Sequence, residues 1–153
     1  MKKIIFATIL TLSQICFSQT IEETVDFIND KLKIHSSLYY GHYEIEISNS
    51  GILKIHTYDI NDSARDPSKS KKHFIAIFEL KSMDIKVTEQ ELFIIRFECP
   101  DKRNCVKETY VHLNKVIRQD NCRLFIADKV NLYKLERAFL HLQKIFKNKT
   151  EPF

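Results

Sequence analysis

The chain has 153 residues, a net charge of +4 and only two glycines, Gly41 and Gly51. Its length fits one domain, and its mild charge argues against a nucleic-acid-binding protein. Two glycines at this spacing cannot supply a GxGxxG dinucleotide-binding loop, a P-loop or a GxSxG nucleophile elbow. No His is followed by Glu, so the HExxH zinc motif is absent from the sequence as well. We therefore predict no cofactor, no metal and no catalytic residue.

Residues 1–18 are predicted to be a signal peptide. Lys2 and Lys3 give it a positive start, and residues 4–17 are a mostly apolar stretch. That stretch is too short and too polar to cross a membrane, which takes about 20 apolar residues. Cys16-Phe17-Ser18 then places small residues where a signal peptidase requires them. A buried N-terminal helix and a lipid attached at the cysteine are the alternatives.

Cleavage is expected between Ser18 and Gln19, or one residue later. It would remove two lysines and no acid, which lowers the net charge from +4 to +2 and leaves no transmembrane segment. The expected product is a single periplasmic or extracellular domain over residues 19–153. The Lys-, Ile- and Asn-rich composition and the Ser-Gln junction resemble those of exported proteins of Bacteroidota.

A helix is predicted over residues 20–33. Thr20 and Glu23 form a capping box, in which each side chain accepts a hydrogen bond from the backbone N–H of the other residue. Apolar residues then recur at helical spacing, namely Ile21, Val25, Ile28 and Leu32.

The period changes to two at Tyr43, where apolar and polar residues begin to alternate through Ser48. Alternation of this kind predicts a half-buried strand. Asn49-Ser50-Gly51 and a second strand over residues 52–58 complete a hairpin, with its glycine in the left-handed conformation. After a polar loop over residues 61–72, further strands are predicted at residues 73–80, 84–88, 91–99, 105–113 and 123–127.

Three cysteines remain after the predicted cleavage: Cys99, Cys105 and Cys122. Export would place them in an oxidising compartment, where two of the three can form a disulfide. Cys99 and Cys105 flank a turn-rich segment between two predicted strands, so this pair is favoured. A bridge from Cys122 to either of the others, and three reduced thiols, are the alternatives.

The last predicted element is a helix over residues 129–147. Its apolar stripe has helical spacing and is expected to cap the core; it consists of Leu132, Leu135, Phe139, Leu142 and Phe146.

Together these elements predict an α+β domain: an N-terminal helix, an antiparallel meander of about seven strands forming a partly open barrel or curved sheet, and a C-terminal capping helix. This element order over residues 43–147 resembles the pleckstrin-homology-like superfold. The resemblance implies a scaffold that binds peptides, proteins or lipid headgroups. Phe139 replaces the usual Trp of the closing helix, and the basic phosphoinositide pattern of the first hairpin is absent. The alternative is an antiparallel sheet with both helices on one face.

The strongest candidate ligand-binding residues lie in the polar loop: Arg65, Lys69, Lys71 and Lys72. Four bases within eight residues could engage an anionic headgroup or ligand, although two aspartates offset half of their charge. His42 and His56 could share a metal across the hairpin, but the favoured interpretation is that they are polar surface or half-buried histidines.

Three functions are consistent with these patterns. The favoured one is a small exported, non-catalytic binding or interaction module, whose partner is a protein or a component of the cell envelope. The second is an anionic headgroup or ligand binder that uses the loop from Arg65 to Lys72. The third is a small hydrolase or an inhibitor of a hydrolase.

Overall fold

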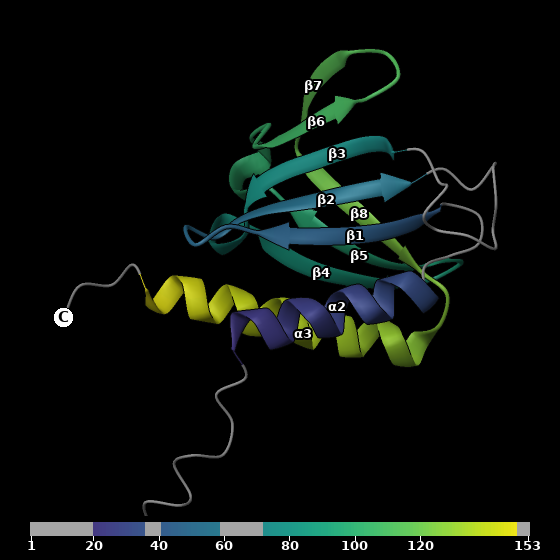
Figure 1. Ribbon diagram of the computed structural model, residues 1–153, viewed down its shortest axis with the longest axis vertical. Coiled ribbons are helices and arrows are strands. Elements are labelled where there is room, and N and C mark those ends of the chain that lie inside the picture. The colour runs from purple at the N-terminus through teal and green to yellow at the C-terminus, as the bar shows by residue number, and fades with distance from the viewer. Residues whose placement is uncertain (1–19, 36–40, 59–71, 150–153) are drawn as a thin grey trace, which may run out of the picture.

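The computed structural model describes residues 20–35, 41–58 and 72–149. Their elements run helix, strands, helix, as predicted (Figure 1). The helices and strands are α2 (Ile21–His35), β1 (His42–Ile47), β2 (Ile52–Tyr58), β3 (Lys72–Glu79), β4 (Asp84–Glu89), β5 (Phe93–Glu98), β6 (Val106–Tyr110), β7 (Lys115–Gln119), β8 (Asn121–Ile126) and α3 (Lys129–Asn148). Two 3-10 turns, η2 (Leu80–Ser82) and η3 (Pro100–Lys102), follow β3 and β5. The α+β class is confirmed.

The strands form two antiparallel sheets and no closed barrel. The larger sheet has the order β1-β2-β3-β6-β7 and the smaller has the order β4-β5-β8. The chain therefore changes sheet after β3, after β5 and again after β7, so the strands do not follow one uninterrupted meander. Neighbouring sequence elements pair within β1–β3, β4–β5 and β6–β7, and the other pairings join strands that are distant in sequence.

The eighth strand of the described residues is β7, where the sequence pattern predicts no strand. The pattern predicts one strand over residues 105–113, but β6 ends at Tyr110, and residues 111–114 form a turn. Asn114 has a φ of 46°, so this turn contains a non-glycine residue in the left-handed region. Only two apolar residues stand between Lys115 and Arg118, which leaves no clear strand pattern in the sequence of β7. The strand pairs with β6 from Tyr110 opposite Lys115 to Val106 opposite Gln119.

The predicted capping box begins α2. The Thr20 backbone N–H donates to Glu23 Oε2 at 2.8 Å, and the Glu23 N–H donates to Thr20 Oγ1 at 3.1 Å. Asn29, whose role the periodicity did not indicate, fixes the helix to β1. Its side chain accepts from the Ile45 N–H at 2.7 Å and donates to the Ile45 carbonyl at 3.1 Å. Such paired bonds place the helix against an edge strand in one register.

The hairpin between β1 and β2 is confirmed, with Gly51 at a φ of 82°. Only glycine adopts this conformation at little cost. A Cβ atom at Gly51 would also lie 3.0 Å from the ring of Phe146 in α3. The turn therefore needs glycine for its backbone and for the close approach of the last helix.

The core lies between the two sheets and against the helices. Phe97 of β5 touches Phe78 of β3 and Phe139 of α3, with ring centroids 5.2 and 5.0 Å apart. The side chain of Asp128 caps α3 by accepting from the Asn131 N–H at 2.9 Å. The helices lie side by side, with α2 on the edge strand β1 and α3 on the edge strand β4 (Figure 1). They thus close the space between two sheets instead of covering one face of a single sheet.

Candidate functional site

A polar pocket of about 270 Å³ opens on the outer face of the small sheet. Most of its lining comes from the ends of β5 and β8 and from the turn that follows β5; it comprises Arg96, Glu98, Cys99, Lys102, Asp120, Asn121 and Arg123. The inward residues of the same strands, among them Phe97 and Leu124, are fully buried in the core. The pocket therefore rests on a rigid part of the fold.

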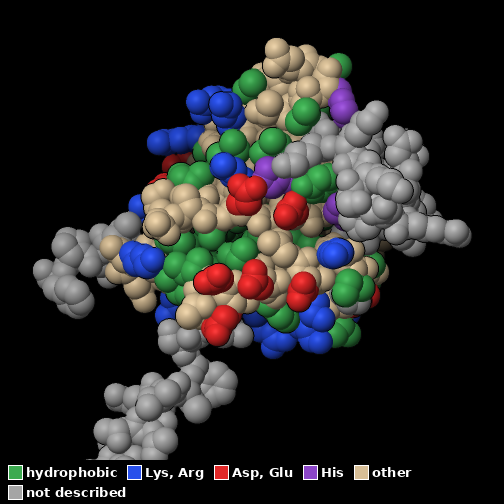
Figure 2. Space-filling model, in the orientation of Figure 1, with side chains coloured by type: hydrophobic (Ala, Val, Ile, Leu, Met, Phe, Trp, Pro, Cys, Tyr) green, Lys and Arg blue, Asp and Glu red, His purple; other side chains and the backbone are tan. Residues whose placement is uncertain are grey.

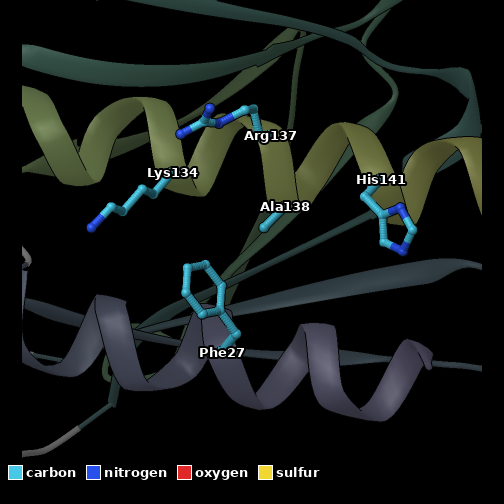
Figure 3. Close-up of a pocket in the computed structure, with 5 residues that line it drawn as sticks. All are labelled: Phe27, Lys134, Arg137, Ala138 and His141. Carbon is cyan, nitrogen blue, oxygen red and sulfur yellow. The ribbon is translucent and has the colours of Figure 1, made fainter. Parts of the chain in front are cut away.

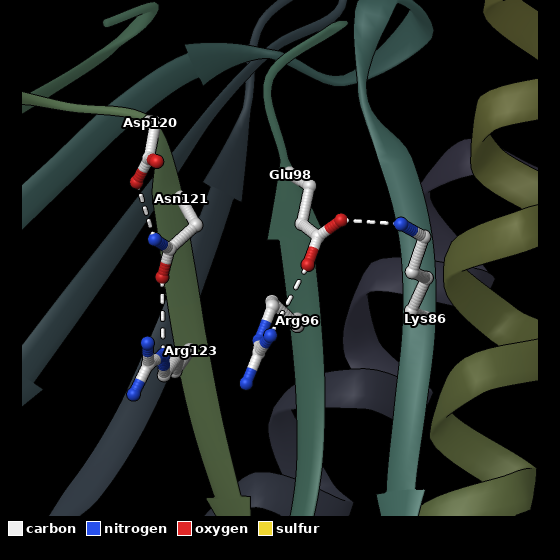
Figure 4. Close-up of polar contacts among 6 residues, drawn as sticks. All are labelled: Lys86, Arg96, Glu98, Asp120, Asn121 and Arg123. Atoms are coloured by element: carbon white, nitrogen blue, oxygen red, sulfur yellow. Dashed lines mark hydrogen bonds and ion pairs between the residues drawn. The ribbon is translucent and has the colours of Figure 1, made fainter. Parts of the chain in front are cut away.

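Three cations lie in one row across the small sheet. Lys86 of β4 is the register partner of Arg96 of β5, and Arg96 is in turn the partner of Arg123 of β8. Like charges directly opposite each other on one face destabilise a sheet. Figure 4 shows that the side chains of Arg96 and Arg123 point the same way along neighbouring strands. Their positive charges accumulate at one side of the pocket.

One carboxylate compensates part of this charge. Lys86 Nζ donates to Glu98, and Arg96 Nη1 lies 3.2 Å from Glu98 Oε1 (Figure 4). The hydrogen bond from Lys86 lowers the pKa of Glu98, and Arg96 lowers it further. The same hydrogen bond raises the pKa of Lys86. Both groups are therefore fully charged at neutral pH, and Glu98 is shared between two cations.

Within the described part of the chain, Arg123 has a neutral hydrogen-bond partner and no acidic one. Its Nε–H donates to Asn121 Oδ1 at 3.1 Å, while the Asn121 amide donates to Asp120. Among the described residues, no carboxylate lies within ion-pair distance of the Arg123 guanidinium. In the same part of the chain, the buried Nε of Arg96 has no hydrogen-bond acceptor. Buried donors are nearly always paired, so this N–H is an unsatisfied donor on one of the residues that line the pocket.

The turn after β5 supplies the fourth cation. A disulfide joins Cys99 to Cys105, with their Cα atoms 5.8 Å apart, which confirms the favoured pairing. The Cys105 N–H also donates to Cys99 Sγ at 3.0 Å. Within the bridged turn Asp101 and Lys102 have φ values of 57° and 53°, in the left-handed region. The bridge thus constrains the turn that places Lys102 at the pocket.

Cys122, the third cysteine of the described residues, is free and buried on the inward face of β8. Burial raises its pKa, and the charge of Glu108 raises it further. It therefore has the character of a small core residue and not that of a nucleophile.

A second cavity, of about 330 Å³, lies between the two helices. It is lined by Phe27 of α2 and by Lys134, Arg137, Ala138 and His141 of α3 (Figure 3). Figure 3 shows Lys134 and His141 pointing apart and Arg137 lying along α3, so the basic groups do not converge. The lining of this cavity also includes one apolar ring, Phe27, and no acid. The sheet pocket is therefore the stronger candidate.

The predicted ligand-binding loop falls largely outside the described residues. Arg65, Lys69 and Lys71 lie beyond them, and Lys72 is described only as the first residue of β3. The loop stays a prediction. No group of three or more potential metal ligands occurs in residues 20–35, 41–58 and 72–149. In the β1–β2 pairing His42 faces Tyr58, and His56 faces Glu44.

No protein-family model, no curated protein and no solved structure matches the chain. The helices within the described part of the chain include none long and apolar enough to cross a membrane.

Proposed function

We propose that the protein is an exported, non-catalytic binding module that recognises an oxyanion, either a carboxylate or a phosphate, at the outer face of the small sheet. The observation that carries the proposal is the row Lys86, Arg96 and Arg123, in which Glu98 pairs with the first two cations and Arg123 has no carboxylate partner among the described residues. A guanidinium without an acidic partner offers paired donors in the geometry that carboxylates and phosphates accept. Binding an anion would relieve the repulsion along this row.

The composition of the pocket supports binding in preference to catalysis. Its lining holds no serine, threonine or histidine, and its cysteine is held in the disulfide. The pocket therefore offers neither a hydroxyl or thiol nucleophile nor an imidazole base. Its shape and charge suit the capture of an exposed anionic group on a larger partner, such as a protein or a component of the cell envelope.

Sulfate is a suitable probe because its charge does not change near neutral pH. We expect Arg123→Gln to weaken sulfate binding by about tenfold or more, because a hydrogen bond to a charged group contributes ~1.5–3 kcal/mol. Glu98→Gln should strengthen binding, since it removes the carboxylate that neutralises Lys86 and Arg96. Chemical-shift titration with sulfate and with acetate measures both effects and compares the two classes of oxyanion.

Arg103→Gln is the matched control, because Arg103 is an exposed arginine of the bridged turn that does not line the pocket. If Arg103→Gln and Arg123→Gln weakened sulfate binding equally, the effect would come from the general charge of the surface and the pocket would not be a specific site. Unchanged affinity in both Arg123→Gln and Glu98→Gln would refute the site.

Export is a separate part of the proposal and has its own test. The disulfide supports it, since such bridges persist in oxidising compartments. We expect mass spectrometry of the protein recovered from the periplasm or medium to show an N-terminus at Gln19 or Thr20. Recovery of the protein with Met1 intact would contradict the predicted cleavage.

A further inference from the structure

The hairpin of β6 and β7 projects from the end of the larger sheet (Figure 1). Its turn and the start of β7 expose three apolar side chains: Leu113 is 71% exposed, Val116 54% and Val111 45%. Figure 2 shows hydrophobic side chains over this projecting end. Single exposed apolar residues are ordinary, but three within six residues on a protruding turn form a concentrated apolar tip.

The base of the hairpin is positively charged. Lys107 and Arg118 are exposed and face each other across the strand pair, and Lys115 is exposed beside the turn. The hairpin's one acid, Glu108, is buried, and it accepts a hydrogen bond from Gln119 at 2.9 Å. The exposed charges of residues 106–119 are therefore all positive.

Charge also limits what can cover this hairpin. β7 is the edge strand of its sheet, and an edge can add a strand from a partner. Lys115 and Arg118 of this strand oppose such pairing, because charged residues on an edge are a common barrier to strand addition. A convex apolar tip with a basic base instead matches a lipid surface, which has an apolar interior beneath anionic headgroups.

We propose that the β6–β7 hairpin docks the protein on an anionic membrane by inserting Val111 and Leu113 among the lipids, while Lys107, Lys115 and Arg118 contact the headgroups. Peripheral elements of this kind enter only ~5–10 Å, to the boundary between headgroups and acyl chains. The pocket and the tip lie at opposite ends of β7, since Asp120 follows the strand and Asn114 precedes it. A docked molecule can therefore keep its pocket open to solvent.

The exposed face of α3 provides a matched comparison. Val130 and Leu140 are exposed there to a similar degree, at 63% and 41%. The neighbouring helix α2 exposes Glu23, Asp26 and Asp30, which an anionic surface would repel. The hairpin and the exposed face of α3 both present apolar side chains, but only the α3 face has these acids on a neighbouring element. We therefore expect only the hairpin to bind an anionic membrane.

The chain contains no tryptophan, so one introduced indole reports its own environment. Leu113→Trp should show a blue-shifted emission with vesicles of phosphatidylcholine mixed with phosphatidylglycerol, and brominated lipids should quench it. Val130→Trp, on α3, should show neither effect. Absence of a blue shift in Leu113→Trp, or an equal shift in Val130→Trp, would overturn the proposal.

Vesicle sedimentation gives the second measurement. Val111→Ser with Leu113→Ser should reduce partitioning by about tenfold or more, because each apolar side chain gains from leaving water. Val130→Ser with Leu140→Ser should leave it unchanged. Lys107→Gln with Arg118→Gln should also reduce it by about tenfold or more, since each base contributes about fivefold near an anionic surface. That loss should vanish on vesicles of phosphatidylcholine alone.

Two further outcomes separate this inference from the proposed function. Arg123→Gln should keep its vesicle binding even where it loses sulfate affinity. The tip variant is Val111→Ser with Leu113→Ser. If Arg123→Gln lost vesicle binding while the tip variant kept it, lipid contact would belong to the pocket, and docking by the hairpin would be overturned. A concentration-dependent dimer that the tip variant abolishes would identify a second copy of the chain as the occupant, and would overturn it as well.

Discussion

Replacing Phe139 by alanine should lower the free energy of unfolding by about 3–5 kcal/mol, a large part of the ~5–15 kcal/mol that stabilises a domain. The side chain is fully buried, and its ring meets that of Phe97 edge to face with centroids 5.0 Å apart. Phe97 in turn touches Phe78 of the larger sheet. A cavity at this point would weaken the packing of α3 on the small sheet and of Phe97 between the helix and the larger sheet.

Urea denaturation followed by circular dichroism measures this loss, since the chain has no tryptophan for fluorescence. Leu140→Ala is the matched control, one residue along the same helix and 41% exposed. It should change the free energy of unfolding by less than about 0.5 kcal/mol. A loss below about 1 kcal/mol for Phe139→Ala would show that the helix does not close the core.

Periodicity predicted the helices because each has a single buried stripe bounded by a cap. The buried residues of α3 include all five that the spacing indicated, from Leu132 to Phe146. The β1–β2 hairpin was also predictable from the sequence, because Gly51 adopts a backbone conformation that few other residues adopt. Local signals of this kind act within a few residues and do not depend on the rest of the fold.

The division of the strands into two sheets depends on contacts between distant residues, which no short stretch of sequence indicates. The pairing of β3 with β6 and of β5 with β8 joins strands separated by other elements. The sequence places Lys86, Arg96 and Arg123 on predicted strands or at their ends, but it does not say that they are register partners. Only the register assembles them into one row, so the sequence alone favours the cluster that is contiguous in the chain, Arg65 to Lys72.

Removing the disulfide with Cys99→Ala and Cys105→Ala should lower the free energy of unfolding by at least about 2–2.5 kcal/mol. This is the loss of loop-closure entropy for so short a loop. The structure gives a reason for a larger effect. Cys99 follows β5 of the small sheet, and Cys105 precedes β6 of the larger sheet, so the bridge closes a connection between the two sheets.

Cys122→Ala is the control for loss of a cysteine as such. Cys122 is buried and free, so its truncation leaves the bridge intact and removes one sulfur atom from the core. It should cost less than the double variant. Non-reducing peptide mapping of the wild-type chain should link Cys99 to Cys105; a peptide that contains Cys122 in a disulfide would contradict the connectivity.

The variant Cys99→Ala with Cys105→Ala should change the sulfate affinity of the pocket as well as the stability of the fold. Cys99 lines the pocket, and Lys102 reaches it from a turn whose left-handed residues lie inside the bridged loop. Without the bridge this turn can relax to ordinary backbone angles, which moves Lys102 away from Arg96 and Arg123. Sulfate affinity should therefore fall in the folded double variant and stay unchanged in Cys122→Ala. If the double variant keeps its sulfate affinity while losing stability, the cation row of the strands binds the anion without help from the turn.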